Sequence, residues 1–197
     1  MFFKMKPLSN IFLIAILLTG QILNAQRKKS AQKSTLETST INILKIGEKI
    51  QGDFNGDGKM EFATLKKVKE RKGNPIENGT PEVYEIQFSD PKIKPILANC
   101  CDIRLINEGD LNNNQTDEIS IYQAPMNGCT YSMTTYSIIN GKWKKIVDTF
   151  LIPTGCEPLS DNDLQQRIFK ENSSIYYFET DMTTENAKLV KKKVIMN

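Results

Sequence analysis

The chain has 197 residues, of which 26 are basic, 23 are acidic and none is histidine. A net charge of +3 does not point to nucleic acid or an anionic membrane as a partner. The lack of histidine excludes Cys-His catalytic pairs and the common histidine-containing zinc sites.

The first 25 residues are typical of a secretory signal peptide. Lys4 and Lys6 precede an apolar run over 11–18, which is too short to span a bilayer, and the small residue Ala25 follows. We expect cleavage between Ala25 and Gln26, with an uncleaved N-terminal anchor as the alternative. No cysteine, the residue that would carry a lipid anchor, directly follows the run, so the sequence does not support a lipid-anchored form. The signal predicts a secreted, periplasmic or cell-envelope protein with no stable membrane insertion once the signal is removed.

The polar segment 26–40 is predicted to be a flexible leader, and residues 41–197 are predicted to form a single β domain. From residue 41 onwards, short runs rich in Val, Ile, Tyr, Phe and Thr alternate with turn residues, which is typical of strands. These runs are INILKI, EFATLKKV, VYEIQF, DIRLI, EISIYQ, YSMTTYSII, KWKKIVDTFLI, SIYYFETD and KLVKKKVIM. The sequence therefore predicts a mainly β fold with antiparallel pairing.

The stretch GDFNGDGKMEF at 52–62 places oxygen-bearing groups at every second position. Calcium binds six to eight hard oxygen ligands, and flanking glycines allow a chain to turn tightly around the ion. The predicted ligands are the side chains of Asp53, Asn55, Asp57 and Glu61 and the backbone carbonyl of Lys59. The alternative is a solvated turn, because Asn-Gly and Asp-Gly are common turn formers.

The spacing distinguishes between two kinds of calcium loop. An EF-hand requires a bidentate Glu at position twelve, where this chain has Thr64, and the following segment favours a strand. With its acidic residue at position nine, the stretch instead resembles the DxDxDGxxD loop of FG-GAP or VCBS repeats, the integrin α-chain-like repeats of secreted bacterial proteins. This resemblance implies a calcium-stabilised loop between strands of a β-propeller blade.

A second stretch, GDLNNNQTDEI at 109–119, aligns with the first without a gap. It carries Asn114 and Gln115 where the first has Asp57 and Gly58, so any second calcium ion should bind more weakly. A hydrogen-bonded, Asn-rich turn is the alternative. Asp117 is expected to point away from the ion into solvent. The corresponding ligand positions are Asp110, Asn112, Asn114, Thr116 and Glu118.

All four cysteines, Cys100, Cys101, Cys129 and Cys156, lie after the signal. An even number in an exported chain predicts two disulfides, and a bond between the adjacent pair is the least expected because it strains the backbone. We expect Cys129 and Cys156 each to pair with one member of the doublet. A thiolate metal site is the alternative, although the chain has no CxxC motif.

Two further elements are expected in the C-terminal half. Asn140-Gly141 predicts a type I′ turn that joins strands 131–139 and 142–150 in a hairpin. Ser160, followed three residues later by Asp163, predicts an N-cap and a short helix that ends near Phe169.

The two loops mark repeat units at about 50–106 and 107–157. A propeller needs at least four blades, so the two units are expected to form a small sandwich or partial propeller; assembly of several chains is the alternative. In the families that these loops resemble, the ion has a structural role. The resemblance therefore implies a secreted binding or adaptor module without catalysis, whose partner is a glycan or an envelope or surface protein.

A metal-dependent or carboxylate-based hydrolase, acting for example on glycans, is the alternative function. Asp161 and Asp163 are the carboxylates that we considered for such chemistry. Their position at a predicted helix start already provides a structural reason for both.

Overall fold

The computed structural model describes residues 44–183 and 187–195. The predicted signal peptide and leader lie outside the described residues. The described residues belong to one compact unit, which is mainly β, with antiparallel sheets and one short helix, as the sequence predicts. Among the described residues, no helix combines the length and the apolar character needed to cross a membrane.

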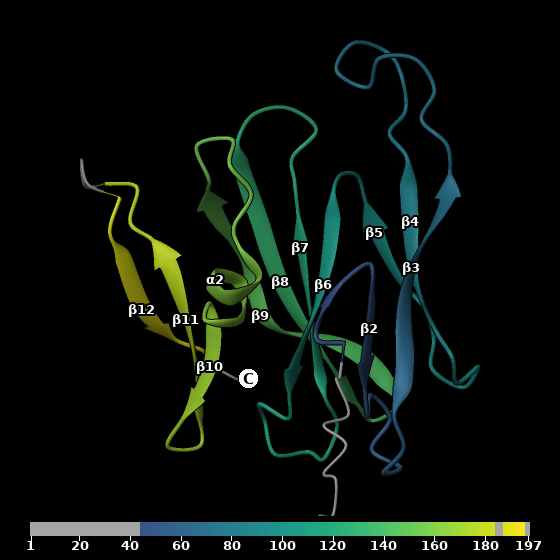
Figure 1. Ribbon diagram of the computed structural model, residues 1–197, viewed down its shortest axis with the longest axis vertical. Helices are drawn as coiled ribbons and strands as arrows, with labels where there is room; N and C mark the ends of the chain where they lie inside the picture. Colours follow the sequence, from purple (N-terminus) through teal and green to yellow (C-terminus); the bar gives the residue numbers. More distant parts are fainter. Residues whose placement is uncertain (1–43, 184–186, 196–197) are drawn as a thin grey trace, which may run out of the picture. The chain divides into compact units, whose positions relative to one another are not determined.

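The strands form three sheets (Figure 1). The central sheet has the order β1-β6-β7-β8-β9, the second has the order β2-β3-β4-β5, and the third has the order β10-β11-β12. In the first sheet the bounds are β1 Ile46–Gly47, β6 Ile103–Gly109, β7 Glu118–Gln123, β8 Thr130–Ile139 and β9 Lys142–Pro153. In the second they are β2 Lys49–Gly52, β3 Glu61–Lys69, β4 Val83–Phe88 and β5 Ile96–Asn99, and in the third β10 Ile168–Glu171, β11 Ser174–Thr180 and β12 Leu189–Lys193.

The central sheet is buried on both faces. Along β7, Ile119 and Ile121 join an apolar cluster with the four-stranded sheet, while Tyr122 joins a second cluster with the three-stranded sheet. This fits strand geometry, because successive side chains point to opposite faces. Figure 1 shows β2–β5 and β10–β12 on opposite sides of β6–β9. The sheets therefore pack as a layered β sandwich.

An internal repeat relates β2–β5 to β6–β9, since each is a run of four antiparallel strands. Ala63 pairs with Phe88 in the first run, and Ser120 pairs with Thr135 at the matching place in the second. Each run opens with a loop that joins its first two strands, so the two candidate loops occupy equivalent positions.

The hairpin around Asn140-Gly141 is confirmed. Ile139 pairs with Lys142, and Asn140 and Gly141 have φ values of 54° and 70°, the left-handed conformation that a type I′ turn requires. The other predicted strand runs are found as well; in the first run, residues 41–43 lie outside the described residues, and of 44–46 only Ile46 belongs to a strand. The sequence analysis did not anticipate β2, β5 and β10.

The predicted helix is present but ends early. Helix α2 covers Asp161–Gln165, and the Ser160 hydroxyl accepts a hydrogen bond from the Asp163 N–H, as expected for an N-cap. The prediction that it continues to Phe169 was wrong, because Ile168 begins β10 and pairs with Tyr177. Sheet pairing therefore overrides the local helical pattern.

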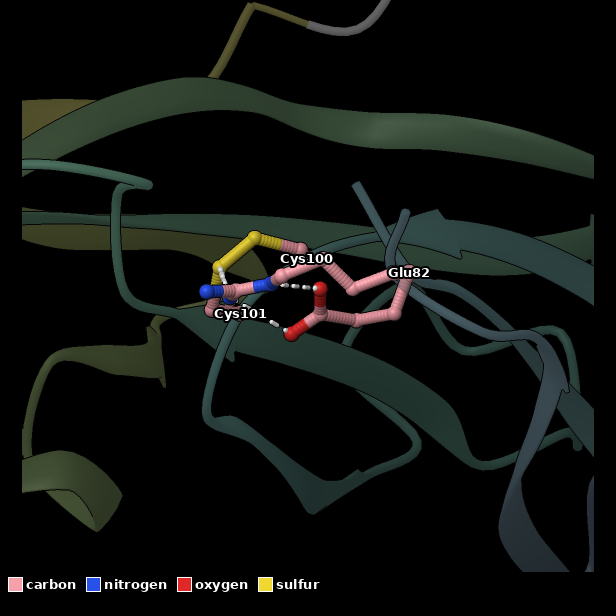
Figure 2. The surroundings of a disulfide bond; sticks show 4 residues. Glu82, Cys100 and Cys101 are labelled. Carbon is pink, nitrogen blue, oxygen red and sulfur yellow. Dashed lines mark hydrogen bonds and ion pairs between the residues drawn. A yellow bond between two sulfur atoms is a disulfide. The ribbon is translucent and has the colours of Figure 1, made fainter. Parts of the chain in front are cut away.

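The predicted cysteine pairing was also wrong: the bonds join Cys100 to Cys101 and Cys129 to Cys156. Cys129 precedes β8 and Cys156 follows β9, and pairing of Thr130 with Pro153 brings the two Cα atoms to 4.5 Å. The doublet lies in the short connection between β5 and β6 (Figure 2).

Next to the doublet, Glu82 accepts two hydrogen bonds from Arg71, at 2.7 and 3.0 Å. These bonds lower the pKa of the Glu82 carboxyl. Because the two sulfurs are bonded to each other, they are not thiolate ligands, and the thiolate metal alternative has no support here.

Candidate metal centre

The first loop, residues 53–61, closes the β2–β3 hairpin and wraps around the carboxylate of Asp53. Asp53 Oδ1 accepts hydrogen bonds from the N–H groups of Gly56 and Asp57 at 2.8 and 3.1 Å, and Oδ2 accepts one from Gly58 at 2.9 Å. Gly56 and Gly58 have φ values of 76° and 80°. The two glycines therefore supply the left-handed conformations that this tight turn requires.

The turn gathers three carboxylates. The candidate ligand oxygens of Asp53, Asp57 and Glu61 all lie within 4.8 Å of one another, a cluster that can hold a metal ion. Glu61 is buried, and its Oε2 accepts a hydrogen bond from Phe54 N at 2.9 Å. Burial raises the pKa of Glu61, and the charges of Asp53 and Asp57 raise it further. A cation would relieve this repulsion.

Asn55 and Lys59, the other predicted ligands, also lie in this loop. Asn55 accepts a hydrogen bond from Asp57 N at 2.8 Å, and its Nδ2 is 3.5 Å from Glu61 Oε1. Lys59 donates its N–H to Asp57 Oδ1 at 2.9 Å, and its exposed ammonium lies 3.9 Å from the same carboxylate. All five predicted residues are therefore brought together, with the Lys59 side chain directed at an acid.

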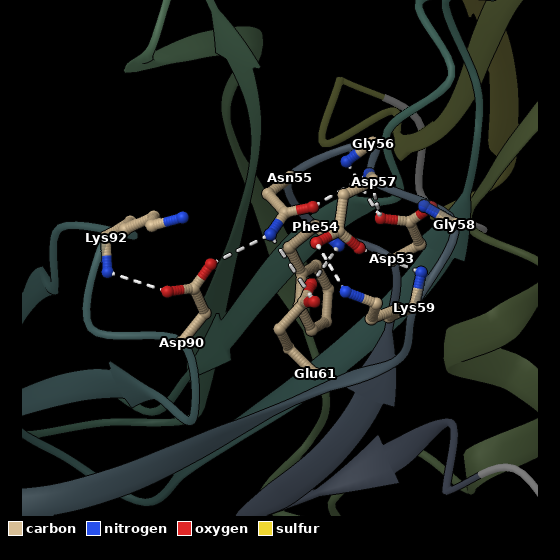
Figure 3. Close-up of polar contacts among 10 residues, drawn as sticks. All are labelled: Asp53, Phe54, Asn55, Gly56, Asp57, Gly58, Lys59, Glu61, Asp90 and Lys92. Carbon is tan, nitrogen blue, oxygen red and sulfur yellow. Dashed lines mark hydrogen bonds and ion pairs between the residues drawn. The ribbon is translucent and has the colours of Figure 1, made fainter.

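A fourth acid, Asp90, was missed by the sequence analysis. It follows β4, and its Oδ2 accepts a hydrogen bond from Asn55 Nδ2 at 3.0 Å (Figure 3). Its Oδ1 accepts a second bond from Lys92 N at 2.9 Å. The strand register would have identified Asp90, because it places this residue at the position that Ser137 occupies in the second unit.

The second loop, residues 110–118, reproduces most of the hydrogen bonds of the first. Asp110 accepts from Asn114 N and Gln115 N, both at 3.1 Å, and Leu111 N donates to Glu118 at 2.6 Å. Asn113 and Gln115 have φ values of 64° and 69°, matching Gly56 and Gly58. The backbone conformation is therefore shared even though the glycines are not.

The amide side chains of the second loop are hydrogen-bonded to the neighbouring strand β8. Asn112 Nδ2 donates to Ser137 Oγ at 2.9 Å, and Asn114 Nδ2 donates to the same oxygen and to Ile138 O, each at 3.1 Å. Thr116 Oγ1 donates to Asn114 Oδ1 at 2.7 Å. The arrangement matches the alternative of an Asn-rich, hydrogen-bonded turn.

The second loop also has a positive charge beside its oxygens. Lys170 on β10 brings its ammonium to Asp110 O, at 3.0 Å, and to Asn113 Oδ1. Burial raises the pKa of Glu118 to about 7. The ammonium group reduces the need for a bound cation at the second loop. The raised pKa of Glu118 parallels that of Glu61 and does not distinguish the two loops.

Asp117 is not the solvated residue that the alternation predicted. Its Oδ2 accepts hydrogen bonds from Asp53 N and from Asn107 Nδ2, both at 3.0 Å, and its own N–H donates to Asp53 O at 2.7 Å. A Cβ on Gly52 would lie 2.5 Å from Asn107 Nδ2 and 2.7 Å from Asp117 Oδ2, so a larger residue there would have to displace this contact. Asp117 therefore joins the two loops directly.

The remaining acids considered for chemistry have structural partners. Asp163 Oδ2 accepts a hydrogen bond at 2.6 Å from the hydroxyl of Ser160, the N-cap of α2, and Asp161 forms an ion pair with Arg104. Glu108 on β6 is different, because burial raises its pKa to about 8 and its Oε1 is buried without a hydrogen-bond partner among the described residues.

No family model, curated protein or solved structure matches this chain. The resemblance of the two loops to FG-GAP repeats therefore stays a prediction. The geometry itself provides one carboxylate cluster that can hold a metal ion and one equivalent loop whose interior is already hydrogen-bonded.

Proposed function

We propose that this protein is an exported, non-catalytic binding or adaptor module whose β sandwich is stabilised by calcium in loop 53–61. The observation that carries the proposal is the convergence of Asp53, Asp57 and Glu61 on one small volume, with Asp90 beside them. Calcium binds carboxylate and amide oxygens of this kind. Carboxylates held so close together repel one another unless a cation lies between them, which favours an ion site over a solvated turn.

The position of the cluster supports a structural role for the ion. Loop 53–61 contacts loop 110–118 through Asp117, so an ion that orders the first loop also supports the junction between the two repeats. The two disulfides are compatible with export, because such bonds persist in oxidising compartments. The partner that we propose for the exposed surfaces is a glycan or a surface protein.

The test is thermal unfolding with calcium or with a chelator. An ion that binds only the folded state adds about 2.7 kcal/mol to the free energy of unfolding at a concentration a hundred times its dissociation constant. We expect calcium to raise the melting temperature of the wild-type protein. Absence of a shift at millimolar calcium would refute the metal assignment.

Two variants at matched positions identify the loop responsible. Asp57→Asn removes a carboxylate from the first loop and should abolish most of the calcium-induced shift. Asn114→Ala, its counterpart in the second loop, should lower the stability without removing the shift, because Asn114 donates hydrogen bonds to Ser137 and Ile138. The reverse order would show that the second loop is the calcium site.

A further inference from the structure

A cavity of about 370 Å³ opens beside the first loop, a size at the lower end of small-molecule sites. It lies between the segment that follows β4 and the turn that joins β8 to β9. Asn55, Asp57 and Asp90 line one part of it, so the cavity shares residues with the carboxylate cluster. The cavity is therefore formed by both repeats.

The apolar part of the cavity is built on Trp143, with Ile93 and Ile138 beside it. The indole N–H donates to Lys94 O at 2.7 Å, and the ring stacks on Phe88 with centroids 5.2 Å apart and an interplanar angle of 27°. The ring is thus held in place before any ligand binds. Because its N–H is already used, it offers ring surface rather than a donor.

The polar part offers both acceptors and donors. Figure 3 shows Asp57 and Asp90 on either side of Asn55, and the Asp57 side chain is 45% exposed. Lys92 and Lys94 line the same cavity. Carboxylates accept hydrogen bonds from hydroxyl groups, and ammonium groups donate to them.

This combination selects among ligand classes. A purely apolar ligand would bury the Asp90 carboxylate against apolar groups, an anion would face Asp90, and an organic cation would face Lys92 and Lys94. A neutral pyranose ring has C–H faces that pack on an aromatic ring and hydroxyl groups that both donate and accept. We propose that this cavity binds a neutral sugar, with the pyranose face on Trp143 and its hydroxyl groups toward Asp57 and Asp90.

The proposal rests on the proposed function in one respect, because it names the glycan as the partner and the calcium loop as one wall of its site. Trp143 is the only tryptophan in the chain, so its fluorescence reports on the cavity directly. The probes are the methyl glycosides of glucose, galactose, mannose, N-acetylglucosamine and N-acetylgalactosamine, each titrated into the calcium-loaded protein. We expect a saturable fluorescence change with at least one of them.

Two variants and a control test whether the sugar binds in this cavity. Ile138→Ala keeps the reporter and should weaken binding several-fold, and Trp143→Phe, followed by calorimetry, should weaken it about tenfold. Tyr176→Ala removes an aromatic ring from β11, which does not line the cavity, and should leave the affinity unchanged. Binding that is equally strong in both cavity variants would overturn the proposal.

The sugar titration and the calcium melting experiment can give opposite results, so the two proposals are tested separately. If calcium raises the melting temperature but none of the glycosides changes the fluorescence up to 100 mM, roughly the limit of weak binding, the sugar site is refuted and the calcium site stands. A glycoside that saturates the fluorescence change while calcium leaves the melting temperature unaltered would support the sugar site and refute the calcium role.

Discussion

The two loops have the same backbone conformation but different residues at the sixth position, and this allows a reciprocal test. Gly58 and Gln115 have φ values of 80° and 69°, respectively. A left-handed conformation costs a non-glycine residue about 1–2 kcal/mol. Gln115 is exposed, and a Cβ at Gly58 would meet no atom within 4 Å, so the conformation itself dominates both exchanges.

We expect Gln115→Gly to increase the free energy of unfolding by about 0.5–1 kcal/mol. This is the relief of the left-handed conformation less about 0.4–1 kcal/mol for the greater freedom of glycine in the unfolded chain. Gly58→Gln should lower the free energy of unfolding by a similar amount. For a domain of this size, 1 kcal/mol corresponds to about 2–4 °C in melting temperature.

The assay is urea denaturation in the presence of a chelator, so that ion binding does not contribute. Gln87→Gly is the matched control, because Gln87 is an exposed residue of β4, where glycine should destabilise the strand by roughly 0.5–1 kcal/mol. If Gln115→Gly destabilises the protein as much as Gln87→Gly does, the proposed equivalence of the two loop conformations is refuted.

Three other predictions concern the carboxyl groups and the disulfides. The pKa of Glu108 rises from 4.5 to about 8 on folding, so stability should fall as the pH rises between these values; Glu108→Gln should reduce the difference between pH 5 and pH 8 in urea titrations. Replacing Cys129 and Cys156 together by Ser, which opens a separation of 27 residues, should lower the free energy of unfolding by about 3.5 kcal/mol; an unchanged denaturation midpoint would argue against this bond. Asp117→Ala should lower it by about 1–3 kcal/mol, whereas the exposed Met60 at the matching position of the first loop should tolerate Ala with a change under about 0.5 kcal/mol.

Much of the strand framework was predictable, because β-branched and aromatic runs and the Asn-Gly turn act locally. The strands missed are the short ones. Ile96–Asn99 and Ile168–Glu171 have four residues each, and their conformation depends on pairing with β4 and β11. The helix ended early for the same reason, since the strand pairing of Ile168 competes with continuation of the turn.

The loop residues were predictable because regular spacing within nine positions needs no tertiary information. The contacts between loops were not. Asp117 was predicted to face solvent because it lies between the alternate positions that face the ion. Its hydrogen-bond partner is instead the backbone of the other loop. Asp90 lies in a different connection, and only the strand register reveals that it corresponds to Ser137. The cysteine pairing likewise depends on the register of the β8–β9 hairpin.

The comparison of the loops shows why turn geometry alone does not identify an ion site. Both loops bend around an Asp and close on a buried Glu, so their backbone hydrogen bonds are nearly the same. They differ in charge: in the second loop the Asn114 amide donates to Ser137 Oγ and Ile138 O on β8, and the ammonium of Lys170 donates to Asp110 O. The Lys170 ammonium supplies a positive charge beside that loop. In the first loop Asp57 stands where the second has Asn114, and Asp90 stands where the second has Ser137, so the first loop carries two more carboxylates. This difference is the reason that we propose an ion in the first loop rather than in the second.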